Sequence, residues 1–197
     1  MRAGSTFIIK KRDHDFGYEV PPKSREELSR DANHIQRTIG YKGDGPFPIV
    51  KFLECILPEC IDGYELYIAT KDELGSKLGE TFPDQCLIKL REDIYDAAVD
   101  GDPMSLMTCA HEAGHLFEHK GLPLSFARKE ATAVTPAYKS SEWQANAFGG
   151  ELLMPSCKIA SMKSWEICMR YGVSPTAART QRRAITERRV RWTLPPL

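Results

Sequence analysis

Three histidines recur at intervals of four residues in the stretch TCAHEAGHLFEHKG, which covers residues 108–121. The first two, His111 and His115, enclose a glutamate in the pattern H-E-x-x-H. On a helix this spacing places both imidazoles on one face, about 6 Å apart at the backbone, so that they can converge on one metal ion. Glu112 then projects beside the open coordination position, where it can take a proton from a metal-activated water. The pattern therefore predicts a catalytic metal site.

His119 is the third histidine of the series, and helix geometry argues against its binding the same ion. It lies about 12 Å from His111 along a helix axis, whereas ligand atoms lie only about 2 Å from a zinc ion. A known alternative pattern has a glycine three residues after the second histidine and a third histidine three residues after that glycine. Here those two positions hold Glu118 and Gly121, so the pattern fails. We expect His119 to be structural or to line a pocket, with oxyanion or substrate contact as the functional alternative.

The third ligand should therefore come from a second segment of the chain, as an acidic side chain. Glu142 fits, since it lies 27 residues after His115 near the start of an expected helix. Asn146, one turn later, is placed to hydrogen-bond the free ring nitrogen of a ligating histidine and to fix its tautomer. Glu130, in an expected loop, and Glu151, near the far end of the same helix, are the competing candidates.

Two helices must position these side chains. Asp102 followed by Pro103 is typical of an N-cap and a first helical position, so a helix should run from there to about residue 119. The second helix should begin at residue 140 or 141 and continue through EWQANAFGGELLM to Pro155.

The segments before the histidines predict a helix and several shorter elements. Ser24 and Glu27 match a capping box, and apolar residues then recur on one helical face until Gly40. The shorter elements are a helix over 49–57 that Pro58 closes, strands over 64–70 and 86–90, and one more strand near 79–83 or 94–99.

The end of the chain is basic. Residues 156–197 hold nine Lys and Arg against two Glu, while the preceding residues hold 18 basic and 25 acidic side chains. The pattern predicts a helix, a turn at Gly172, and a second helix with Ser174 as N-cap and Pro175 at its first position. This pair could read DNA, pack on the catalytic core with a solvated basic face, or dock on an acidic protein patch. The arginines available for phosphate contacts are Arg179, Arg182, Arg183, Arg188 and Arg189.

Length and composition indicate a single sizeable core. The 197 residues contain no apolar run of about 20 residues that could span a membrane, and the early FII segment is too short for a signal peptide. The six cysteines form no C-x-x-C pair and are expected to be reduced and mostly buried. These observations predict a cytoplasmic protein with no membrane partner.

Two segments, taken together, resemble a known family. AHEAGHLFEH and EWQANAFGGELLMP are similar to the A-H-E-x-G-H helix and the downstream E-x-x-A-N-x-F-A-x-x-L-L-M-P segment of the ImmA/IrrE bacterial metallopeptidases. The resemblance is sharp over 108–155 and extends in outline from 24 to about 185. Gly149 and Gly150 stand where the family usually has alanines, which could loosen the helix but changes no ligand.

The resemblance implies specific roles and a fold. His111, His115 and Glu142 would bind Zn²⁺, and Glu112 would be the catalytic base. The fold would be α+β and zincin-like, with a small, mostly antiparallel sheet packed on helices and the H-E-x-x-H helix at its centre. The chain would then comprise an N-terminal arm, a metallopeptidase domain and a basic helix pair packed on that domain, over 1–23, 24–155 and 156–197.

The implied function is a zinc-dependent endopeptidase that cuts a regulatory protein, because family members cut or inactivate helix-turn-helix repressors. The oxyanion would need a donor, for which His119, Tyr138 and Arg128 are the candidates. The alternative is a non-hydrolysing metal-containing protein that controls a repressor or DNA by contact. Glu112 favours the enzyme, since a pure binding protein has no need of it.

Overall fold

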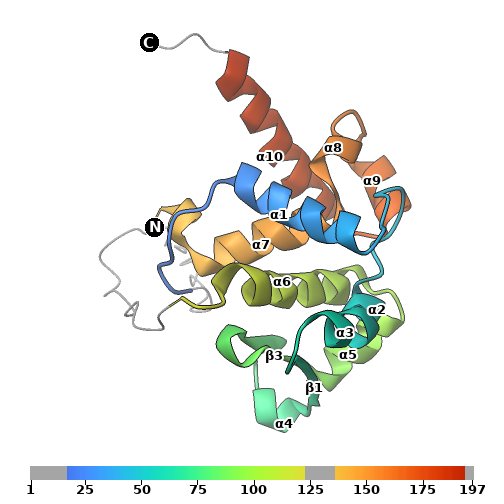
Figure 1. The fold of residues 1–197 in the computed structure, drawn as a ribbon. Coiled ribbons are helices and arrows are strands. Elements are labelled where there is room, and N and C mark those ends of the chain that lie inside the picture. Colours follow the sequence, from blue (N-terminus) through green and yellow to red (C-terminus); the bar gives the residue numbers. More distant parts are fainter. Residues whose placement is uncertain (1–16, 123–135, 194–197) are drawn as a thin grey trace, which may run out of the picture.

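One helix, α6 (Pro103–His119), lies at the centre of the molecule. In the computed structural model, which describes residues 17–122 and 136–193, α1 (Arg25–Thr38) and α7 (Ser141–Leu153) lie on one side of α6 and a small sheet lies on the other (Figure 1). The expected α+β architecture with the H-E-x-x-H helix at its centre is thus confirmed.

The sheet has three strands in the order β1-β3-β2. β1 (Glu65–Ala69) pairs parallel with β3 (Leu87–Arg91), whereas β2 (Gly79–Phe82) pairs antiparallel with β3. The sheet is therefore mixed, and the expectation of mostly antiparallel pairing needs correction. The connection from β1 to β3 contains the short helix α4 (Lys71–Leu74) and β2 itself, which gives the chain enough length to return and run parallel.

The first helix begins as its sequence predicts. Ser24 accepts a hydrogen bond from the Glu27 amide, and the Glu27 carboxylate accepts one from the Ser24 amide, which completes the capping box. Leu28 and Ala32, on the expected apolar face, are fully buried where α1 packs against α7.

The segment between α1 and the sheet is helical for longer than expected. α2 (Ile49–Lys51) passes through a π-helical turn (Phe52–Ile56) into α3 (Leu57–Cys60), so Pro58 lies within the helical run and does not close it. In the widened turn the Leu57 amide bonds back to the Phe52 carbonyl, which shifts the hydrogen-bond pattern just ahead of the proline. α5 (Glu92–Val99) is also helical, so the third strand is the earlier of the two alternatives.

The C-terminal residues form the expected helix pair after a short helix, α8 (Ser156–Ile159). Gly172, in the left-handed region, separates α9 (Ser164–Tyr171) from α10 (Pro175–Thr193). Side chains of this pair and of the turn between its helices join the main apolar core, namely Ile167, Tyr171, Val173, Ala178 and Ile185. The far end of α10 projects from the body of the molecule (Figure 1).

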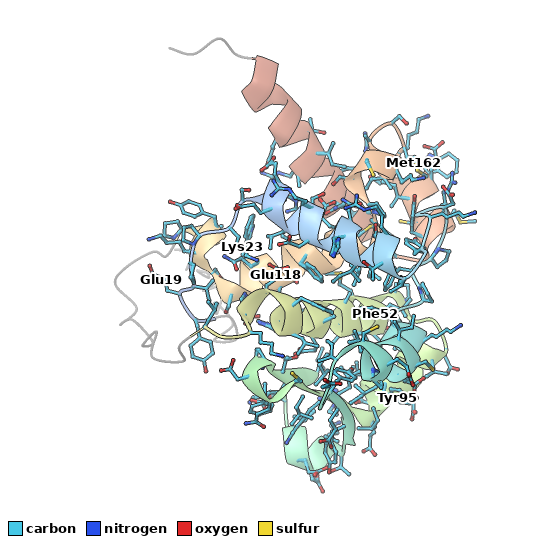
Figure 2. All side chains as sticks on the ribbon, viewed as in Figure 1. Glu19, Lys23, Phe52, Tyr95, Glu118 and Met162 are labelled. Carbon is cyan, nitrogen blue, oxygen red and sulfur yellow. The ribbon has the colours of Figure 1, made fainter. Side chains whose placement is uncertain are left out.

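The segment from Gly17 to Lys23 runs antiparallel beside residues 138–141, which lead into α7. Backbone hydrogen bonds join Val20 to Lys139 and Lys23 to Tyr138, at 2.8 and 3.0 Å. The Lys23 ammonium forms an ion pair with the buried carboxylate of Glu118, which fastens this segment to α6 (Figure 2).

The cysteines only partly meet their expectation. All six are free thiols, but Cys55, Cys60 and Cys157 are exposed, so they are not mostly buried. Within residues 17–122 and 136–193, no helix has both the length and the apolar character needed to cross a membrane.

Candidate metal centre

Glycines allow α6 and α7 to approach each other closely. A Cβ atom built on Gly114 would lie 2.8 Å from the Ala145 carbonyl oxygen, and one on Gly149 would lie 3.0 Å from the Ala110 carbonyl. Real Cβ atoms essentially never approach backbone atoms as closely as at Gly114, so that position needs glycine for the helices to touch. At Gly149 a Cβ would be unusually tight, and the Ala110 backbone would have to shift slightly to accept it. Gly149 therefore belongs to the contact between α6 and α7. The family resemblance had suggested only that this glycine could loosen the helix.

This contact brings three side chains to one point. The Nε2 atoms of His111 and His115 lie 3.0 Å apart. Oε2 of Glu142 lies 3.3 Å from His111 Nε2, and Oε1 of Glu142 lies 3.4 Å from His115 Nε2. Ligand atoms about 2.0–2.1 Å from a tetrahedral zinc ion are about 3.3 Å apart, so the three fit one ion. Among the residues that the structure describes, these three form the group able to hold a metal.

Of the competing acidic residues, Glu151 is engaged elsewhere. Its buried carboxylate accepts hydrogen bonds from Ser156 and from Ser29 on α1, and Arg25 lies 3.8 Å from it. Glu130 lies outside the described residues.

The three side chains are coupled electrostatically. Burial raises the pKa of Glu142, but the contacts of its carboxylate with the His111 and His115 rings lower it well below its usual range. Burial lowers the pKa of His111, and hydrogen bonding to Glu142 with the charges of Glu112 and Glu142 outweighs it, so the net shift is upward. Glu142 is therefore ionised at neutral pH, as a metal ligand must be.

Glu112 is held by the edge strand of the sheet. Its carboxylate Oε2 accepts a hydrogen bond of 2.6 Å from the Thr81 hydroxyl on β2, and its side chain is buried. Gly79, also on β2, lies so close that an added Cβ would be 2.8 Å from the Glu112 Cγ. Sequence analysis missed both residues, and only their position in the expected strand over 79–83 could have pointed to them.

His119 lies one helical turn beyond His115 and is 8 % exposed. Below, the side chains of His111, His115 and Glu142 are called the metal-facing side chains. Its Nδ1 is 3.0 Å from the Nδ1 of His115, and its Nε2 is 3.2 Å from the Gln144 side-chain oxygen. Burial, together with the charge of His115, lowers its pKa to about 4, so His119 is neutral at pH 7.

The other residues singled out in the sequence are Asn146, Tyr138 and Arg128. Asn146 is exposed on α7, donates to the Glu142 backbone carbonyl at 2.8 Å, and hydrogen-bonds His111 through its side chain. Tyr138 is 48 % exposed, and its backbone carbonyl accepts hydrogen bonds from Lys23 and Gln144. Arg128 lies outside the described residues.

The three metal-facing side chains open into a cleft of about 1140 Å³. β2 forms one wall, the start of α10 forms another, and α6 and α7 contribute the metal-facing residues between them. The α10 residues that line it are small or polar and uncharged: Thr176, Ala177, Thr180 and Gln181.

Comparisons with known proteins identify the family of the chain. No curated protein matches the chain. A solved structure described as a Mycobacterium tuberculosis transcriptional regulator aligns with this chain at 14% sequence identity and a TM-score of 0.49. The alignment covers 78% of this chain and 46% of that chain, so this chain spans less than half the length of the regulator. The family model for the M78 peptidases, described as the IrrE N-terminal-like domain, matches residues 71–180, which include β2, α6 and α7. Since this match covers more than half of the chain, the protein belongs to the ImmA/IrrE family of M78 metallopeptidases.

Proposed function

We propose that the chain is a zinc-dependent endopeptidase that hydrolyses a peptide bond in a regulatory protein. The observation that carries the proposal is the separation of the ligand atoms on His111, His115 and Glu142, which matches the edges of a tetrahedral zinc site. Two imidazole nitrogens and one carboxylate oxygen, with an open fourth position, are the ligands of catalytic zinc in peptidases.

Glu112 is the proposed general base. Zinc, when bound, supplies Lewis acidity that lowers the pKa of water and polarises a carbonyl. Thr81 holds Oε2 of Glu112, which leaves Oε1 to take a proton from the attacking water and return it to the leaving amine. The oxyanion donor stays a prediction, and because both ring nitrogens of His119 are engaged within the protein, Tyr138 and Arg128 are its remaining candidates.

The proposed substrate is a helix-turn-helix repressor in the cytoplasm. The support is family membership together with a cleft large enough for an extended peptide. We further propose that residues 24–155 form the catalytic unit, preceded by an N-terminal arm over 1–23, with the basic helices of 156–197 packed on this unit. The solvated basic face would then dock on the protein substrate, and direct DNA binding is the alternative.

The test combines metal content with cleavage, using candidate helix-turn-helix repressors as substrates. Elemental analysis should find one zinc per chain in wild type and Glu112→Gln and none in Glu142→Ala. Cleavage should fall by about 10³-fold or more in Glu112→Gln, because proton transfer typically contributes 10²–10⁴-fold. Glu118→Gln is the matched control, since it neutralises another buried carboxylate on α6 that is paired with Lys23.

Two results would overturn the proposal. If wild type binds no zinc, the proposed ligand set is wrong. If Glu112→Gln controls the repressor as well as wild type does, the chain acts by contact, as the non-hydrolysing alternative requires.

A further inference from the structure

The orientation of one buried amide determines the direction of a chain of hydrogen bonds. Gln144, on α7, is 1 % exposed, and its side-chain nitrogen lies 2.8 Å from the Pro21 carbonyl and 2.9 Å from the Tyr138 carbonyl. Backbone carbonyls only accept hydrogen bonds, so the NH₂ group of Gln144 must face them. The amide oxygen of Gln144, which is an acceptor, consequently faces His119.

The same reasoning extends through His119 to His115. The His119 Nε2, 3.2 Å from the Gln144 oxygen, must carry a proton in order to donate. In a neutral imidazole the other nitrogen is then an acceptor, so His119 Nδ1 accepts from the Nδ1–H of His115, 3.0 Å away. The remaining nitrogen of His115, Nε2, carries a lone pair, and this is the atom that lies among the metal-facing ligands.

We infer that Gln144 and His119 are positioning residues that hold His115 in the tautomer whose Nε2 can bind metal. The inference deepens the proposed function and rests on it for the role of His115 as a ligand. It also gives the Gly17–Lys23 segment a role, since the Pro21 carbonyl orients Gln144 from this segment. A histidine that ligates a metal commonly depends on the hydrogen bond made by its other nitrogen.

The direct test is the tautomeric state of the histidines in ¹⁵N-labelled, zinc-free protein at neutral pH, read from two-bond ¹⁵N–¹H couplings. His115 should carry its proton on Nδ1 and His119 on Nε2. The opposite tautomer at either histidine would overturn the inference. Because the measurement needs neither zinc nor substrate, it tests the inference separately from the proposed function. The inference can be wrong while the proposed function is right, and the reverse is also possible.

The second test is zinc affinity measured by chelator competition. Gln144→Met keeps the side-chain volume but removes the orienting amide, and it should weaken zinc binding by about 10- to 100-fold. Gln36→Met is the matched control, because Gln36 is a buried amide that donates to two backbone carbonyls, those of Glu151 and Leu152. An equal loss of affinity in both variants would show a general structural effect and overturn the inference.

Substitutions of His119 provide a rescue experiment. His119→Leu removes the acceptor for the His115 Nδ1–H and should weaken zinc binding by about 10- to 100-fold. His119→Gln offers an amide oxygen as a replacement acceptor and should recover most of that loss. If Gln and Leu weaken zinc binding equally, the hydrogen bond from His115 does not position the ligand and the inference is wrong.

Discussion

The two sides of the centre are built in different ways. On the ligand side, which consists of His111, His115 and Glu142, the geometry is set by direct contact between the backbones of α6 and α7. On the strand side, which consists of Gly79 and Thr81 beside Glu112, the position of the Glu112 carboxylate is set by two features. These are the hydrogen bond from the Thr81 hydroxyl and the room that Gly79, which has no side chain, leaves for Glu112.

Under the proposed function, this difference separates metal binding from proton transfer. A helix backbone that meets another backbone cannot absorb an added atom without moving a whole element, whereas a side chain can rotate away from one. Changes on the ligand side should therefore remove the metal, and changes on the strand side should leave the metal bound and slow the reaction.

The largest effect should follow Gly114→Ala. The added methyl group would lie 2.8 Å from the Ala145 carbonyl oxygen, so α6 and α7 must separate and the ligands must spread. We expect a loss of zinc affinity of about 100-fold or more and a fall of about 1–3 kcal/mol in the free energy of unfolding. Zinc competition and urea denaturation measure the two quantities. Gly45→Ala is the control, because the nearest atom to its added Cβ would be 4.0 Å away. If Gly114→Ala binds zinc with wild-type affinity, the close contact between α6 and α7 does not position the ligands.

Gly79→Ala should have the next largest effect and a different signature. Its methyl group would lie 2.8–3.0 Å from three atoms of the Glu112 side chain and would push the carboxylate from its position. We expect kcat to fall by about 10- to 100-fold, since small displacements of catalytic groups have effects of this size. Zinc content should stay at one per chain, and loss of zinc would contradict the separation of the two sides.

Thr81→Val should slow the reaction less. It removes the 2.6 Å hydrogen bond to Glu112 Oε2 while keeping the shape of the side chain. A hydrogen bond to a charged group contributes about 1.5–3 kcal/mol. Because Glu112 keeps its place beside Gly79 in this variant, we expect only the lower end of that range to reach the barrier, so kcat should fall by about tenfold. Thr81→Ser keeps the hydroxyl and should retain near wild-type kcat; if Ser and Val are equally slow, the hydroxyl is not the cause.

The smallest effect is a pH dependence of His119, which contacts the ligand side through His115. The pKa of His119 is about 4 in the folded protein, below the value of about 6.5 in an unfolded chain, so the unfolded state takes up the proton first. Stability from this group is complete above pH 6.5 and is lost as the pH falls toward 4. Between pH 6.5 and 5.5 the free energy of unfolding of zinc-free wild type should fall by about 1 kcal/mol more than that of His119→Gln. Urea denaturation at both pH values checks this, and parallel losses would mean that His119 is not held neutral.

Local elements were determined by short-range sequence features. Asp102 caps α6 through the Ser105 amide and Ser140 caps α7 through the Trp143 amide, as expected from residues that lie within one turn of each other. The H-E-x-x-H spacing likewise placed His111 and His115 on one face, because a helix fixes the positions of residues four apart.

Contacts between segments were decided only by the tertiary structure. Before the resemblance was considered, the sequence left Glu142, Glu151 and Glu130 open as the third ligand, and the glycine contact between α6 and α7 is what places Glu142 beside the histidines. The link from Pro21 through Gln144 to His119, and the contact of Thr81 with Glu112, join residues far apart in the chain. The local periodicity of the sequence does not predict such pairs. Their proximity depends on how helices and strands pack, and packing is a property of the whole fold.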